Sequence, residues 1–279
     1  MKIWEAIIYA VFGGAAELLP ISFGGHSAIL GGIFNLSSLS EGGGYYVRAA
    51  ICLGVMAAIV LSFSAETLSF GRELLLVTGL KRRRRGQRTD AVQRRSILLG
   101  FFALVPMLCS LLFTAAAERI SSLLIIALLF AVNGLFLFLC SRRRTGKKTE
   151  KTVLLSDTLL IGLARMLSVF PGLSSVGSSV AVAQARGLST RYALRLTYLL
   201  TLCYEAAAFL FYLIRGIAFG SFTAAILLPM LVAMLVSGIV GYLAIQYFRY
   251  LLNRGKLVVF AYYCFDAAAI ALVLSLINL

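Results

Sequence analysis

Residues 17–26 read ELLPISFGGH, and they lie within an apolar stretch that runs over 1–35. They bring together an acid, Glu17, a hydroxyl, Ser22, and the only histidine, His26, on a backbone interrupted by proline and glycine. An ionisable side chain at membrane depth costs about 2.5–3.5 kcal/mol on insertion scales, so it marks a functional site by default. We therefore predict a broken membrane helix that carries a polar site. The structural alternative is that Glu17 and His26 only pair with each other or with the backbone.

A second stretch of the same kind follows half a chain later. Residues 170–179 read FPGLSSVGSS and lie within the interrupted apolar stretch 154–186. A Gly/Ser run in a membrane helix is usually a close-packing face, but backbone N–H groups at a helix start also hold phosphate oxygens. The first stretch has the same order of proline, serine and glycine. Two broken helices at matched positions predict one binding site between them.

The composition is that of a membrane protein, because 61% of the 279 residues are hydrophobic and only 13% are charged. A spanning helix needs about 20 mostly apolar residues, because its backbone polar groups must be satisfied within the segment. We expect a single all-α, multi-pass membrane domain over 1–279. Six spanning helices are expected at 45–64, 97–117, 121–140, 192–214, 222–247 and 257–278.

The formal net charge of +15 is concentrated in short basic segments. Two basic loops are expected at 80–96 and 142–151, and a third basic segment covers 249–256. Short loops rich in lysine and arginine face the cytoplasm. Contact with membrane lipid head groups explains this charge more simply than nucleic-acid binding does, so no nucleic-acid partner is expected.

The positions of these loops also predict the topology. If all three basic segments are cytoplasmic, an even number of crossings separates them, so 154–186 enters and leaves the membrane on the same side. It is then a re-entrant helical hairpin, with 1–35 as its counterpart. Residues 1–141 and 152–279 become two inverted-topology repeats, each with one hairpin and three spans. The two broken tips are expected to meet inside the membrane, and both termini to lie outside.

Arginines within or beside the apolar stretches are candidates for binding an anion. Arg165 and Arg195 flank the second tip in sequence, and Arg48 lies at the outer end of its span. A guanidinium suits phosphate oxygens because it donates bidentate, charge-assisted hydrogen bonds. The acids Glu205 and Asp266 are interpreted first as structural partners of these arginines, and second as catalytic groups.

The motifs resemble those of the bacitracin-resistance family of undecaprenyl-diphosphate phosphatases. The first family motif is E-G-x-x-E-F-L-P-[IV]-S-S-T-G-H and the second is P-G-x-S-R-S-G-x-T. Residues 157–172, 188–200 and 239–254 also look like family segments, so the resemblance covers almost the whole chain. It implies hydrolysis of a polyprenyl diphosphate to the monophosphate during recycling of the cell-wall lipid carrier. It also implies the bacterial cytoplasmic (inner) membrane and a divalent cation, Mg²⁺ or Ca²⁺, in an active enzyme.

The resemblance assigns roles to residues of both tips. Glu17, His26 and Ser174 are the expected catalytic residues, and Glu17 is also the expected metal ligand. The matching motif positions and the nearby arginines form the expected substrate-binding set: Ser22, Gly25, Ser175, Gly177, Ser179, Arg48, Arg165 and Arg195.

Four motif positions depart from the family pattern, and they concern the chemistry. Gly13 replaces the first glutamate, Phe23 the second serine, Gly24 the threonine, and Ser175 the arginine. In one interpretation the chain is a divergent phosphatase in which Arg48, Arg165 or Arg195 replaces the lost arginine. In the other it binds and translocates polyprenyl phosphate lipids without turnover, as a flippase or transporter. The sequence also leaves open whether the protein forms a homodimer.

Overall fold

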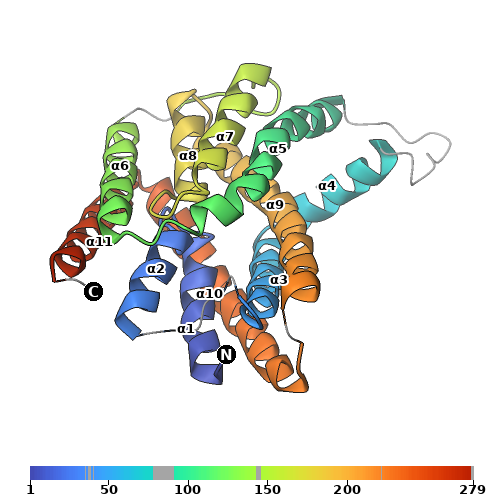
Figure 1. Ribbon diagram of the computed structural model, residues 1–279. Coiled ribbons are helices and arrows are strands. Elements are labelled where there is room, and N and C mark those ends of the chain that lie inside the picture. The colour runs from blue at the N-terminus through green and yellow to red at the C-terminus, as the bar shows by residue number, and fades with distance from the viewer. Residues whose placement is uncertain are drawn as a thin grey trace.

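The computed structural model describes residues 1–34, 36, 39, 41–77, 91–142, 146–220 and 222–277. This part of the chain is built from α-helices and contains no β-strand (Figure 1). Six of its helices are long and apolar enough to cross a membrane. They are α3 (Gly44–Ser62), α5 (Ala91–Ala117), α6 (Leu123–Ser141), α9 (Thr190–Phe219), α10 (Leu227–Asn253) and α11 (Val258–Leu276). The predicted all-α, multi-pass membrane fold with six spans is confirmed.

Four shorter helices form two pairs, each at one of the interrupted stretches. They are α1 (Ile3–Ala16) with α2 (Phe23–Phe34), and α7 (Leu155–Leu167) with α8 (Ser175–Ala185). The breaks carry Pro20 and Pro171, which lack a backbone N–H. Gly172 has φ +113°, a conformation that side chains disfavour. Each short helix falls below the length of about 20 residues needed to span a membrane, and the re-entrant path of the two pairs stays a prediction.

The segments around the predicted basic loops differ from expectation. The helix α4 (Ser64–Val77) follows α3 almost directly, although the sequence analysis predicted no helix there. Residues 80–90 of the predicted loop 80–96 lie outside the described residues, whereas 91–96 form the start of α5. In the predicted loop 142–151, residues 143–145 lie outside the described residues.

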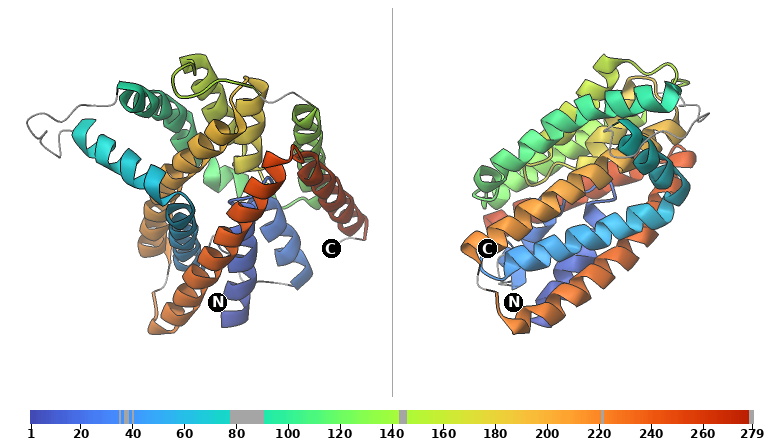
Figure 2. Two further views of the ribbon diagram at one scale, coloured as in Figure 1. Left: turned by 180° about the vertical axis from the view of Figure 1, so that it is seen from behind. Right: turned by 90° about the vertical axis from the view of Figure 1, so that its right-hand side faces the viewer.

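The long helices pack in pairs that connect the two halves of the chain. α3 packs against both α9 and α10, and it lies between them in the right-hand view of Figure 2. α6 packs against α11, α1 against α10, and α7 against α5. If the helices of the second half repeat those of the first in order, the contact of α1 with α10 has its counterpart in that of α7 with α5. The inverted repeats stay a prediction that these pairings support.

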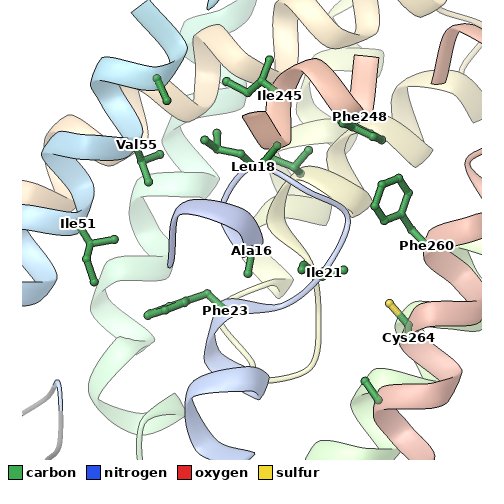
Figure 3. Packing of buried hydrophobic residues seen from close by; sticks show 14 of the residues in the cluster. Ala16, Leu18, Ile21, Phe23, Ile51, Val55, Ile245, Phe248, Phe260 and Cys264 are labelled. Carbon is green, nitrogen blue, oxygen red and sulfur yellow. The ribbon is translucent and has the colours of Figure 1, made fainter. Parts of the chain in front are cut away.

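The main core surrounds the first break. Figure 3 shows Leu18 and Ile21 of that break enclosed by Val55 of α3, Ile245 of α10 and residues of α11. Leu18 is fully buried. The outward faces of the spans carry many exposed large apolar side chains, as expected where the solvent is lipid. Spans from both halves therefore hold the broken backbone of the first tip in place.

Candidate functional site

The two breaks meet in the interior, as the sequence analysis predicted. The hydroxyl of Ser22 accepts hydrogen bonds from the backbone N–H groups of Gly172, at 2.8 Å, and Gly25, at 3.2 Å. The hydroxyl of Ser174 donates to the carbonyl of Leu19 at 3.2 Å. Each serine therefore satisfies a backbone group that the break in the other helix pair sets free.

Glycines permit the close approach of the two tips. A Cβ atom on Gly25 would lie 2.5 Å from two ring carbons of Phe130 and 3.0 Å from the backbone nitrogen of Gly172. A Cβ atom on Gly177 would lie 3.0 Å from the Cβ of Pro20. These two expected substrate-binding glycines therefore have a packing role, because any side chain would push the tips apart.

Two polar residues that the sequence analysis missed also stabilise the breaks. The side chain of Asn133 in α6 accepts a hydrogen bond from the backbone N–H of Ser174 at 3.1 Å. The hydroxyl of Tyr198 in α9 donates to the carbonyl of Leu18 at 2.8 Å. The isolated asparagine in the otherwise apolar stretch 123–141 was the available signal, because a buried amide requires partners.

The expected catalytic residues His26 and Ser174 are both held by internal hydrogen bonds. His26 Nδ1 lies 2.5 Å from the Ser22 carbonyl, which can only accept, so this nitrogen carries the proton. His26 Nε2 then accepts from the hydroxyl of Tyr263, at 2.7 Å. The fully buried Ser174 caps α8 by accepting from the backbone N–H of Gly177 at 2.9 Å. Neither side chain lines the cavity that lies beside the two tips.

That cavity lies beside the joined tips and has a volume of about 680 Å³, within the range of ligand sites. Its wall includes the expected site residues Glu17, Ser22, Ser175 and Arg48. Further hydroxyl-bearing residues also line it: Tyr9, Ser27, Thr114, Ser168, Tyr204 and Tyr212. It extends to the α2–α3 and α5–α6 connections, through Leu39 and 117–123. These connections are the ones predicted to lie outside.

Arg48 and Glu17 form an ion pair in the cavity wall. Arg48 Nη2 contacts Glu17 Oε1 at 2.6 Å. The Arg48 guanidinium also lies 4.0 Å from the ring centre of Phe23 and 5.4 Å from that of Tyr212. Its Nη1 atom is buried and has no hydrogen-bond partner. Arg48 is therefore held by aromatic rings and one carboxylate while part of its donor edge stays available.

A second arginine lies behind the same wall. Arg165 is 2% exposed, and its guanidinium lies 4.9 Å from the ring centre of the cavity-lining Tyr204. Among the residues that the structure describes, none offers a hydrogen-bond partner to its three guanidinium nitrogens. The neighbouring Glu205 is 1% exposed, and its Oε1 atom also has no partner. Glu205 interacts electrostatically with Glu17, Arg48 and Arg165, so all four charges belong to one cluster.

Two expected substrate-binding residues, Arg195 and Ser179, do not take part in this site. Arg195 lines a separate cavity of about 170 Å³ between α4, α5 and α9, together with Tyr192 and Glu150. The hydroxyl of Ser179 donates to the carbonyl of Ser175 at 2.8 Å, one turn earlier in α8. The structure thus brings Arg48 and Arg165 to the site but leaves Arg195 outside it.

The packing also explains two of the motif departures. A Cβ atom on Gly13 would lie 2.7 Å from Ile51 Cγ2 and 3.3 Å from a ring carbon of Phe23. The space that a glutamate at position 13 needs is therefore filled by Ile51 and by the phenylalanine that replaces the motif serine. The glycine at position 13 and the phenylalanine at position 23 are therefore coupled, because the ring of Phe23 occupies part of the space that an acid at position 13 would need.

The available donors do not fit a divalent cation held by protein carboxylates. Within the described ranges, no group of three or more His, Cys, Asp or Glu side chains is placed to hold a metal ion. The expected ligand Glu17 is paired with Arg48, and position 13 offers no acid. Mg²⁺ and Ca²⁺ require several oxygen ligands, so the expected cation stays a prediction that this donor set does not favour.

Comparison with known proteins places the chain among relatives of similar length. Undecaprenyl-diphosphatase 1 of Shouchella clausii (strain KSM-K16) is 26% identical, over 98% of this chain and 96% of that protein. The undecaprenyl-diphosphatase of Methanobrevibacter smithii is 27% identical over 100% of both chains. That of Carboxydothermus hydrogenoformans is 28% identical, over 99% of this chain and 98% of that protein.

The family model described as bacitracin resistance protein BacA matches residues 6–270. This match includes both broken tips and ends within α11, at residue 270. The chain therefore belongs to the BacA family.

Proposed function

We propose that this protein hydrolyses undecaprenyl diphosphate, or a closely related polyprenyl diphosphate, to the monophosphate and thereby recycles the cell-wall lipid carrier. The observation that carries the proposal is the cavity where the two broken helices meet. It presents a guanidinium, a carboxylate and hydroxyls inside a membrane domain. Membership of the BacA family, whose curated relatives are named undecaprenyl-diphosphatases, supports the same activity.

The groups of the cavity have distinct roles in this proposal. Phosphoryl transfer depends mainly on positioning and on stabilising negative charge. Arg48 and the start of α8, where Ser175 lines the cavity, bind phosphate oxygens through N–H donors and the helix dipole. Glu17 is the one expected catalytic residue in the wall, and it accepts a proton from the attacking water when the phosphate replaces it at Arg48. The water oxygen bonds to the terminal phosphorus while the bond from that phosphorus to the bridging oxygen breaks, which releases inorganic phosphate and leaves the prenyl monophosphate. The prenyl chain extends into the lipid.

The proposed setting is the cytoplasmic membrane of a bacterium, with the cavity open to the outer side. The positive-inside rule places the basic segments 142–151 and 249–256 in the cytoplasm. The cavity extends to the α2–α3 and α5–α6 connections, which the same rule places opposite. Hydrolysis then occurs at the outer leaflet, where the carrier has delivered its cargo. A homodimer stays a prediction.

The test is phosphate release from undecaprenyl or farnesyl diphosphate by the purified protein in detergent, with and without Mg²⁺ or Ca²⁺. We expect release above the detergent blank, and a loss of about 100-fold or more in Glu17→Gln, in the range for removal of a general base. Glu66→Gln in α4, away from the cavity, is the control and should keep wild-type release. Retained binding of polyprenyl phosphate without any release would overturn the enzyme proposal in favour of a carrier.

A further inference from the structure

We infer that the cavity binds the diphosphate through the guanidinium groups of Arg48 and Arg165, without a divalent cation held by protein carboxylates. This inference rests on the proposed function, because it describes how the same lipid head group is held. It also names the positive charges that replace the motif arginine at Ser175.

Two of the three glutamates in the cavity wall are already paired with arginines, and the third, Glu41, offers a cation a single carboxylate. Glu17 is already neutralised by Arg48 at 2.6 Å, and Glu118, another acid in the wall, contacts Arg215 at 3.2 Å. A cation at Glu17 would have to displace a guanidinium that Phe23 holds from the other side. Two positive charges competing for one carboxylate at this depth make the metal-bound state unfavourable.

The aromatic contacts argue for arginines as the anion-binding groups. Arg48 lies against Phe23 and Tyr212, and Arg165 lies against Tyr204. A ring that faces a guanidinium stabilises its charge without using its N–H donors, which lie in the plane of the group. The donors stay free for the oxygens of a phosphate, and Arg48 Nη1 and all three nitrogens of Arg165 are free in this way.

The unpartnered N–H donors of the buried Arg165 fit it to bind an anion. Arg165 is only 2% exposed, and among the described residues it forms no hydrogen bond or close ion pair, so its charge is balanced only at longer range by Glu205. Its ring partner Tyr204 lines the cavity, and so does Ser168, the C-cap residue of α7, three positions after Arg165. Tyr204 therefore lies against Arg165 and also lines the cavity, so an anion that displaces this ring reaches the Arg165 guanidinium.

The cluster also balances its charge when the site is empty. Two arginines, Arg48 and Arg165, share one region with two acids, Glu17 and Glu205. With both acids ionised, the four groups carry no net charge, which lowers the cost of burying the empty site. A diphosphate carries more than one negative charge, and its binding takes the Arg48 guanidinium from Glu17.

The test measures binding of a methylene-bridged farnesyl diphosphate analogue, which is not hydrolysed, by isothermal titration calorimetry. We expect the dissociation constant in EDTA to stay within twofold of that in Mg²⁺. Arg48→Gln and Arg165→Gln should each weaken binding at least tenfold, as expected for a charge-assisted hydrogen bond. The matched control Arg191→Gln, an exposed position at the start of α9, should stay within twofold.

Arg165→Gln leaves Arg48, which is paired with Glu17, as the only arginine of the cluster near the buried Glu205, so the folding of the variant is checked by thermal unfolding. The double variant Arg165→Gln/Glu205→Gln removes both charges and keeps the test valid if the single variant does not fold. The double variant should also bind at least tenfold more weakly than wild type. Wild-type binding by a folded variant that lacks Arg165 would show a purely structural role and overturn the inference.

A metal-dependent outcome would also overturn it. Such an outcome is loss of analogue binding in EDTA with recovery in Mg²⁺, together with one Mn²⁺ site per chain by electron paramagnetic resonance that Glu17→Gln removes. If phosphate release persists in that case, only the inference fails. If the analogue binds in EDTA through both arginines but no substrate releases phosphate, the inference holds and the proposed hydrolase activity fails.

Discussion

The residue that best explains the divergent motif is Phe23. Its ring fills the space beside Gly13 and supports the guanidinium of Arg48 on its face. Phe23, at the position of a motif serine, therefore leaves no space for an acid at position 13 and provides an aromatic surface on which Arg48 packs. The two changes are coupled because side chains in a packed interior share the same volume.

Restoring only the motif acid should destabilise the protein. Gly13→Glu would force its side chain against Ile51 and Phe23, so we expect a loss of roughly 1–3 kcal/mol or more from overpacking and burial of a charge. The double variant Gly13→Glu/Phe23→Ser should recover part of that stability, because serine frees the space. Thermal unfolding in detergent measures both. An equal loss in the single and double variants would contradict the coupling.

A second prediction at this scale concerns the contact between the tips. Gly25→Ala places a methyl group against the ring of Phe130, and we expect it to cost about 1–3 kcal/mol of stability. Gly31→Ala in the same helix is the matched control, since the nearest atom lies 4.0 Å from its Cβ. That variant should be neutral or slightly stabilising, because alanine favours a helix. Equal melting temperatures for the two variants would show that the tips are not tightly packed.

At the scale of elements, each broken helix pair completes the other. Ser22 of the first pair accepts the Gly172 N–H of the second, and Ser174 of the second donates to the Leu19 carbonyl of the first. Spans α6 and α9 add Asn133 and Tyr198. Backbone groups released by proline therefore find partners in the protein, which is what membrane burial demands.

Ser22→Ala should loosen this junction. It leaves the N–H groups of Gly25 and Gly172 without their acceptor, and a buried unsatisfied donor costs about 1–3 kcal/mol. Ser27→Ala, whose hydroxyl bonds only to the Gly24 carbonyl in the same helix, is the control. Hydrogen exchange of the amides at 172–174 should accelerate in the first variant alone. Unchanged exchange there would argue against the junction.

At the scale of the whole molecule, the topology sets the side on which the cavity opens. A cysteine at position 41 should react with a membrane-impermeant maleimide from outside the cell, and one at position 147 only after the cell is opened. Both positions lie in connections, and the five native cysteines are buried or partly buried, so the parent protein is the control. The reverse labelling pattern would overturn the predicted orientation and the proposed outer-leaflet reaction.

Much of the fold could be predicted because its signals are local. Each span is a continuous apolar stretch, and each break carries its own proline and glycine, so neither needs knowledge of distant residues. The helix α4 was missed because Ser64–Val77 is less apolar than a span, although Glu66 lies in its first turn, where an acid favours a helix start. The site was harder, because hydrogen bonds of residues such as His26 depend on a partner as distant as Tyr263.

The sequence by itself determined that this is a six-span membrane protein with two broken helices, because lipid imposes those patterns on every segment separately. Only the tertiary structure decided which charges share the site. All three arginines, Arg48, Arg165 and Arg195, lie within or beside apolar stretches of the sequence. The packing of α3, α7 and α9 places Arg48 in the cavity wall, Arg165 behind the wall residue Tyr204, and Arg195 in a separate cavity. Contacts between distant helices make that choice, and no local pattern records it.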